Sequence, residues 1–203
     1  MNSKKIQIIA FAAFVLIAGL AIYMGVFGNS SNNSDETERT AQQVQILKYS
    51  DFQCPACKTY VPAVKELKRE FGDLIDFDYR HFPLDGFQYS RIAAHSAEAA
   101  REQDKFMEMH DLIFEYQEEW SQGGAREMFF EFAERLDLDM EQFEEDIESE
   151  EIARRVESQK QEGIRRMVNS TPTFFLNGQR LRQNPQNYEQ FKSIVELYMY
   201  RSN

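Results

Sequence analysis

Cys54 and Cys57 are the only cysteines in this sequence of 203 residues, and they occur in the segment Cys54-Pro55-Ala56-Cys57. Two cysteines separated by two residues can close into a disulfide across one helical turn and open again by thiol exchange. The pair lies between a segment with strand character and a segment with helical periodicity. The sequence therefore predicts redox chemistry at this pair.

The two cysteines are expected to divide this chemistry between them. Cys54 would lie at the amino end of a helix, where free backbone N–H groups and the helix dipole favour thiolate over thiol. Its pKa should therefore fall below the ordinary value of roughly 8.5. Cys57 would lie one turn deeper, with fewer free N–H groups and more packing around it. We predict that Cys54 exchanges with substrate and that Cys57 resolves the mixed disulfide.

Two other uses of the cysteine pair are less favourable. A purely structural disulfide over so short a loop removes little chain entropy from the unfolded state and would stabilise the fold weakly. A metal site needs three or four ligands, and His81, His95 and His110 do not have the spacing of a zinc module. For each histidine, an ordinary packing or surface role is the simpler interpretation.

The segments that flank the cysteines indicate how they are held. Residues 44–52 contain β-branched and aromatic residues over a length suited to a strand. Over residues 55–71, apolar residues recur at three- and four-residue spacing, which predicts a helix kinked at its internal Pro62. Residues 74–82 have the pattern of a second strand, and a strand, helix, strand unit implies parallel pairing.

The rest of the chain predicts a helical block, a hairpin and a final helix. Residues 88–168 are helical in period and poor in strand signals. Strand character returns at residues 173–176, and Asn177-Gly178 predicts a tight turn that sends the chain back antiparallel. The final helix is expected to begin at Asn187. We predict one α/β domain over residues 44–203.

The first 28 residues differ in composition from the rest. Lys4 and Lys5 precede an almost uninterrupted apolar stretch over residues 6–27, which is long enough to cross a bilayer as a helix. We predict a retained signal anchor, a transmembrane helix over residues 1–28, with its N-terminus in the cytoplasm because the positive charges come first. A cleaved secretory signal is the alternative. Residues 29–43 are polar and predict a flexible linker to an extracytoplasmic domain.

The formal net charge of the chain is −11. Nucleic acid and anionic lipid headgroups are negatively charged as well, so both are poor candidate partners. The charge therefore argues against a nucleic-acid-binding function.

The predicted order of elements, with the cysteines opening the first helix and Thr171-Pro172 opening the third strand, resembles the DsbA-like family. The resemblance covers roughly residues 44–200. It is carried by three segments, which are SDFQCP at residues 50–55, FEYQEEW at residues 114–120 and STPTFFLNG at residues 170–178. The resemblance implies an α/β thioredoxin-like fold with an inserted helical subdomain.

The resemblance also implies a substrate site and a mode of recycling. Thr171-Pro172 would be a cis bond against the cysteine pair, and the backbone of Thr171 would pair with an extended substrate segment. Pro55 and Ala56 would belong to the same motif. No cofactor is implied beyond the redox-active disulfide. Because the sequence has no third cysteine, a different protein must recharge or reduce the pair, and the family implies a membrane redox partner for that step.

Two residues depart from the family's pattern. Lys48 lies six residues before Cys54, at a position where the family usually carries an acid beneath the active site. The lysine either stabilises the thiolate, and so modulates its pKa, or directs its ammonium to solvent along a strand edge. Ala56 stands where the strongest oxidants of the family have histidine, which leaves the oxidising strength open.

These observations lead to three hypotheses of function. The leading one is a membrane-anchored, extracytoplasmic thiol:disulfide oxidoreductase that donates its disulfide to cysteine-containing exported proteins. The second is a reductase or isomerase that uses the same pair with electrons from a membrane partner. The third is a non-catalytic module that holds unfolded chains in a groove. The reduction potential distinguishes the first two hypotheses, and replacement of both cysteines tests the third.

Overall fold

The computed structural model describes residues 40–201. The predicted signal anchor over residues 1–28 lies outside this range, as does most of the predicted linker. In the part of the chain that is described, no helix is both long and apolar enough to span a bilayer. Residues 40–43 have no regular secondary structure and lead into the first strand.

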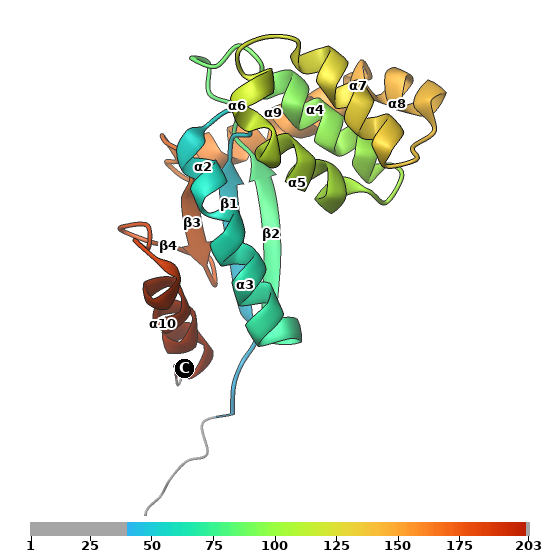
Figure 1. Ribbon diagram of the computed structural model, residues 1–203. Helices are drawn as coiled ribbons and strands as arrows, with labels where there is room; N and C mark the ends of the chain where they lie inside the picture. Colours follow the sequence, from blue (N-terminus) through green and yellow to red (C-terminus); the bar gives the residue numbers. More distant parts are fainter. Residues whose placement is uncertain (1–39, 202–203) are drawn as a thin grey trace, which may run out of the picture. The chain divides into compact units, whose positions relative to one another are not determined.

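A four-stranded sheet forms the centre of the fold over residues 40–201 (Figure 1). Its strands are β1 (Val44–Ser50), β2 (Ile75–His81), β3 (Thr173–Leu176) and β4 (Gln179–Arg180), in the spatial order β2-β1-β3-β4. β1 pairs in parallel with β2 and antiparallel with β3, and β3 pairs antiparallel with β4. The predicted parallel unit and the predicted hairpin at Asn177-Gly178 are both confirmed. Because β1 has a neighbour on each side, it is an inner strand of the sheet.

The chain leaves β1 through a short loop and enters two consecutive helices. These are α2 (Pro55–Thr59) and α3 (Val61–Phe71), with Tyr60 between them. The expectation of one helix kinked at Pro62 is wrong, because the helix is interrupted at Tyr60 instead. Pro62 lies in the first turn of α3, where its missing N–H removes no helical hydrogen bond. A 3-10 turn over Gly72–Leu74 then leads into β2.

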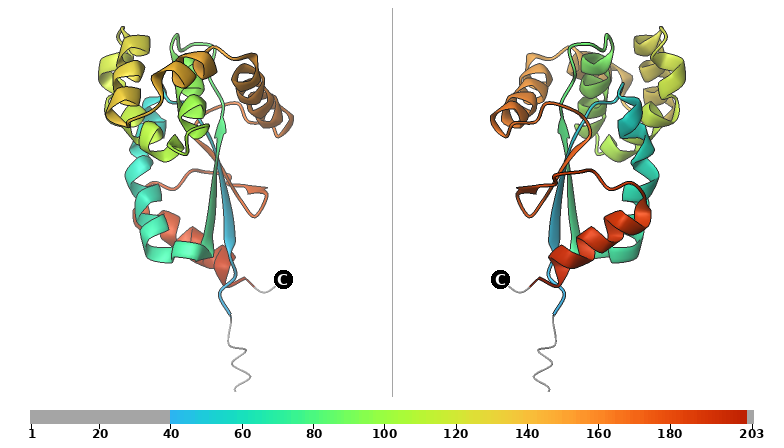
Figure 2. Two further views of the ribbon diagram at one scale, coloured as in Figure 1. Left: turned by 90° about the vertical axis from the view of Figure 1, so that its right-hand side faces the viewer. Right: turned by 90° about the vertical axis from the view of Figure 1, so that its left-hand side faces the viewer.

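One face of the sheet is covered by α3 and by the C-terminal helix α10 (Tyr188–Met199), as Figure 2 shows. Both helices share an apolar cluster with β1, β2 and β3. Its buried members are Val44, Ile46, Val64, Leu67, Ile75, Phe174, Leu176, Phe191, Val195 and Met199. Alternate residues of a strand point to the same face, so Lys48 points to the same side as Val44 and Ile46.

Six helices lie between β2 and β3 in the sequence, and they pack beyond the carboxyl ends of β1 and β2 (Figures 1 and 2). They are α4 (Ser90–Arg101), α5 (Phe106–Glu115), α6 (Gln117–Trp120), α7 (Ala125–Arg135), α8 (Met140–Ile147) and α9 (Glu150–Arg165). Their alanine and aromatic side chains form a buried cluster that also contains Phe52, Cys54 and Cys57. The helical insertion therefore packs directly against the cysteines.

The other face of β1 packs against α9. Tyr49 points to this face, and its hydroxyl donates a hydrogen bond of 2.8 Å to the Glu162 carboxylate. At Gly163, an added Cβ would lie 2.7 Å from the ring of Phe82 and 3.0 Å from the ring of Tyr49. A side chain larger than that of glycine at position 163 would therefore push α9 away from the sheet.

Candidate active site

Cys54 and Cys57 lie at the first turn of α2. Cys54 immediately precedes the helix, with extended backbone angles (φ −76°, ψ 117°), and its carbonyl oxygen accepts a hydrogen bond of 3.0 Å from the Cys57 N–H. Pro55 and Ala56 are exposed, whereas Cys57 is completely buried. Cys54 is 6% exposed, so a substrate can reach only a small part of this residue.

The loop before β3 faces the cysteine pair. The Thr171-Pro172 peptide bond is cis, as the resemblance implied. The Cys54 sulfur lies 3.4 Å from the carbonyl oxygen of Thr171, to which it donates a hydrogen bond when it is protonated. The side-chain amide of Asn184 donates to the carbonyl of Pro172 at 2.7 Å. The structure therefore brings the predicted nucleophile and the predicted substrate-binding backbone together from distant parts of the chain.

The surroundings give the two thiols opposite acidities. A hydrogen bond from the Cys57 thiol is the largest of the effects that lower the pKa of Cys54 to about 6. The side chain of Thr171 and the N–H groups of Cys57 and Ala56 act in the same direction, and burial opposes them. Burial raises the pKa of Cys57, and the adjacent Cys54 raises it further. At neutral pH, Cys54 is therefore a thiolate while Cys57 keeps its proton.

Lys48 lies beneath the cysteine pair and is completely buried. Its Nζ donates to the carbonyl oxygen of Cys57 at 3.4 Å and lies 5.3 Å from the ring centre of Phe114 and 5.9 Å from that of Tyr79. The interpretation that its ammonium reaches solvent along a strand edge is wrong, because the residue is 0% exposed and β1 is an inner strand. Burial lowers the pKa of Lys48, whereas negative charge on the cysteine pair acts to raise it. Its influence on the Cys54 thiolate stays a prediction.

A buried carboxylate fixes the loop that carries the cysteines. One oxygen of Asp51 accepts hydrogen bonds from the Gln53 N–H at 2.7 Å and the Ser90 hydroxyl at 2.6 Å, and the other accepts from the Leu84 N–H at 2.7 Å. Burial raises the pKa of Asp51, although these three hydrogen bonds oppose that effect. Sequence reasoning included Asp51 in the segment at residues 50–55 but assigned it no role. These three hydrogen bonds show that Asp51 ties the cysteine loop to α4 and to the segment that leads into α4.

Gln117 of α6 is a second positioning residue that the sequence did not reveal. Its side-chain amide donates to the carbonyl oxygens of Phe52 at 2.6 Å and Cys54 at 3.0 Å. The residue is 3% exposed, so the insertion holds the start of α2 through a buried amide. Helical periodicity gives no sign of this role, because polar residues ordinarily lie on the solvent side of a helix. Its place in the segment at residues 114–120 was the one available signal.

The histidines have other partners. The imidazole of His81 lies 2.8 Å from the carboxylate of Glu98, and the ring of His110 packs against Tyr79 and Phe114. Within residues 40–201, no group of three or more His, Cys, Asp or Glu side chains is arranged to hold a metal ion.

Several curated proteins match part of this chain. The Na(+)/H(+) antiporter NhaA 3 of Salinispora tropica is 38% identical over 153 residues, which cover 75% of this chain and 22% of the antiporter. NhaA 1 of Salinispora arenicola is 40% identical over 138 residues, which cover 68% of this chain and 20% of the antiporter. The chain thus spans about a fifth of the length of these relatives.

Solved structures share the fold. BdbD from Bacillus subtilis, in its oxidised form, has a TM-score of 0.68 and 21% identity, with 79% of this chain and 92% of that chain covered. For alpha-DsbA1 from Wolbachia pipientis the TM-score is 0.67 and the identity 17%, with 77% and 86% covered. A thioredoxin-like oxidoreductase from Silicibacter pomeroyi gives 0.65 and 23%, with 77% and 86% covered. These likenesses confirm the predicted thioredoxin-like fold with a helical insertion.

A family model joins these observations to the sequence. The model described as thioredoxin matches residues 39–197, a range that contains the cysteine pair, the helical insertion and the cis proline. The match covers most of the chain and all of the sheet. The chain belongs to the thioredoxin family and has the fold of its DsbA-like members.

Proposed function

We propose that this protein is a thiol:disulfide oxidoreductase that acts outside the cytoplasm and donates the Cys54–Cys57 disulfide to cysteine-containing exported proteins. The observation that carries the proposal is the position of the Cys54 sulfur, at the start of α2 and 3.4 Å from the Thr171 carbonyl oxygen. A thiolate in that position lies beside backbone that can pair with an extended substrate segment. Membership of the thioredoxin family supports the same reaction.

The exchange begins when a substrate thiolate attacks Cys54 in the disulfide form of the enzyme. A bond forms between the substrate sulfur and Cys54, the bond between Cys54 and Cys57 breaks, and the electron pair passes to Cys57, which takes up a proton. A second substrate thiolate then attacks the substrate sulfur of the mixed disulfide. The substrate disulfide closes and Cys54 leaves as a thiolate. Its low pKa makes it a good leaving group in this step.

The acidity of Cys54 supports the oxidase direction. A pKa of about 6 stabilises the reduced form of the pair at neutral pH, and a pair whose reduced form is stabilised is a stronger oxidant. A reductase or isomerase that uses the same pair is the alternative. It would be recognised by a reduction potential near that of thioredoxin.

The N-terminal segment supports a position at the membrane. Residues 1–28 have the composition of a signal anchor, and Lys4 and Lys5 precede the apolar stretch. The proposed topology is a single pass with the catalytic domain in the periplasm or on the outer face of the cell. A membrane redox partner would reoxidise the pair, and anchoring both proteins in one bilayer raises their effective concentration.

Equilibration of the full-length protein with glutathione tests the direction of exchange. The oxidase proposal predicts a reduction potential near about −120 mV, and a value near about −270 mV would identify a reductase. The double variant Cys54→Ser, Cys57→Ser is the control. If this variant supports the folding of exported proteins as well as the wild type does, the domain is a binding module and the exchange proposal fails.

Trapping of mixed disulfides tests the roles of the two cysteines. Cys57→Ala removes the resolving thiol and should accumulate substrate bound through Cys54, seen on a nonreducing gel. Cys54→Ala is the matched control and should trap little, because Cys57 is completely buried. Trapping by Cys54→Ala in place of Cys57→Ala would reverse the assignment.

A further inference from the structure

Lys48 is a buried lysine without a carboxylate partner in the described part of the chain. It is 0% exposed, and its Nζ makes a hydrogen bond to the neutral carbonyl of Cys57. The rings of Phe114 and Tyr79 lie against the ammonium. A buried ammonium is strongly disfavoured unless an opposite charge lies close to it. The nearby group that can supply this charge is the cysteine pair.

The counter-charge exists in one redox state and not in the other. In the reduced pair, Cys54 is a thiolate above Lys48. In the disulfide, neither sulfur carries a charge. Burial lowers the pKa of Lys48, while negative charge on the cysteine pair, which Cys54 carries at neutral pH, raises it. Formation of the disulfide therefore removes the interaction that keeps this lysine protonated.

We propose that Lys48 binds a proton when the Cys54–Cys57 disulfide is reduced and releases it when the disulfide forms. This inference rests on the proposed function of the pair. Two electrons and two protons convert the disulfide and a neutral Lys48 amine into a Cys54 thiolate, a Cys57 thiol and a Lys48 ammonium. The net charge of the site is the same before and after. In exchange with a substrate dithiol, the substrate supplies both electrons and both protons as it becomes a disulfide.

The other titratable groups around Lys48 do not change their protonation state near neutral pH. Burial raises the pKa of Tyr79 on β2, so its hydroxyl stays protonated. Burial lowers the pKa of His110 on α5 to about 4, so its ring stays neutral. Asp111, the next residue, is ion-paired with Lys65 at 2.7 Å. In this cluster, the cysteine pair and Lys48 are therefore the groups whose charge responds to the redox state.

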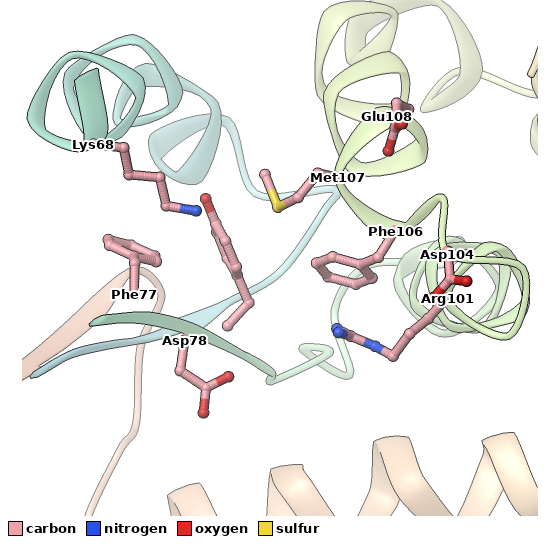
Figure 3. Close-up of a pocket in the computed structure, with 9 residues that line it drawn as sticks. Lys68, Phe77, Asp78, Arg101, Asp104, Phe106, Met107 and Glu108 are labelled. Atoms are coloured by element: carbon pink, nitrogen blue, oxygen red, sulfur yellow. The ribbon is translucent and has the colours of Figure 1, made fainter. Parts of the chain in front are cut away.

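Lys68 of α3 provides a matched control. Its Nζ lies 5.3 Å from the ring centre of Tyr79, close to the 5.9 Å of Lys48. Lys68 is partly exposed, however, and with Phe77 and Arg101 it lines a cavity of about 380 Å³ (Figure 3). Water can solvate its ammonium in both redox states. Lys68→Met should therefore leave the proton count of the redox reaction unchanged.

The experiment measures the equilibrium constant K for reduction of the full-length protein by glutathione, from about pH 6.5 to about pH 8, where the glutathione thiol is mostly protonated. Two glutathione molecules release two protons. The wild type takes up both, so K should vary little with pH. The Lys48→Met variant takes up only one proton, so its K should rise about tenfold per pH unit once Cys54 is ionised. This change corresponds to about 30 mV in reduction potential per pH unit. The ratio of the wild-type K to the Lys48→Met K should fall about tenfold per pH unit, and Lys68→Met should follow the wild type.

A ratio that is constant over this pH range, with exchange retained in both proteins, overturns the proposal and leaves the proposed function intact. A wild type that does not react with glutathione overturns both. Carbon-13 NMR of labelled lysine in the wild type covers the case in which Lys48→Met does not fold. The Lys48 Cε signal, assigned by its loss in Lys48→Arg, should report a neutral amine in the oxidised protein and an ammonium in the reduced protein near neutral pH. The same charge in both states overturns the proposal.

Discussion

The acidity of Cys54 depends on the thiol beside it, and the substitution Cys57→Ala tests this dependence. The substitution removes the S–H group whose hydrogen bond is the largest effect that lowers the pKa of Cys54. Hydrogen bonds to charged groups contribute about 1.5–3 kcal/mol. One pKa unit corresponds to about 1.4 kcal/mol. The pKa of Cys54 should therefore rise from about 6 to roughly 7–8 in this variant.

The assay is the ultraviolet absorbance of the thiolate as a function of pH, with the rate of alkylation at neutral pH as a second measurement. Cys57→Ser is the matched control, because its hydroxyl keeps a donor in place and the pKa should stay closer to that of the wild type. The N–H groups at the start of α2 remain in both variants. They keep the pKa from returning fully to the value of an unstructured cysteine.

Two results would refute this reasoning. A wild-type pKa near the ordinary value of roughly 8.5 would remove the basis for assigning exchange chemistry to Cys54. A low pKa that is the same in the wild type and in Cys57→Ala would show that the helix terminus and the Thr171 contacts, and not the neighbouring thiol, set the acidity.

Three further substitutions test the packing around the site, each by urea denaturation followed through the fluorescence of the single, buried tryptophan. Burial raises the pKa of Glu98, but hydrogen bonds and charges from His81 and Arg101 outweigh it and hold this pKa at about 2, below the usual 4.5. The ionised Glu98 therefore stabilises the fold above pH 4.5, and this contribution is lost as the pH falls toward 2. Glu98→Gln should therefore cost about 3 kcal/mol at neutral pH and weaken the acid dependence of stability, whereas the exposed control Glu108→Gln should cost less than about 1 kcal/mol. Gly163→Ala should cost about 1–3 kcal/mol because the new methyl group meets the ring of Phe82, and unchanged stability would show that α9 can move away freely. Gln117→Leu should cost about 1–3 kcal/mol by leaving two buried carbonyls unpaired, and a smaller loss would mean that water replaces the amide.

Much of the fold could be predicted because its signals are local. The β-branched and aromatic residues of segment 44–52, the helical spacing after Pro55 and the Asn177-Gly178 turn each act within a few residues, and each element is found where it was expected. The helix break was placed at the wrong residue. The proline shows that a regular helix cannot pass through it, but it does not show whether the chain bends at Pro62 or ends one helix at Tyr60 and starts another.

The candidate site was predicted only in part. The sequence singles out Cys54, Cys57, Thr171 and Pro172 by their types and order, and the structure brings Cys54 and Thr171 together. Asp51 and Gln117 escaped because an acid in a loop and an amide on a helix are ordinary in any sequence. Their importance lies in partners that other elements supply.

The sequence by itself determined the reacting groups and the order of the elements, since these follow from residues that are close along the chain. The tertiary structure alone decided the electrical surroundings of those groups. Whether Lys48 meets water or the cysteine pair depends on Tyr79 of β2 and Phe114 of α5, whose rings lie against its ammonium group although they are distant along the chain. Without these rings the same lysine would be solvated, whereas with them it is buried beneath the cysteine pair, where the dielectric response is weak and the charge of one sulfur matters.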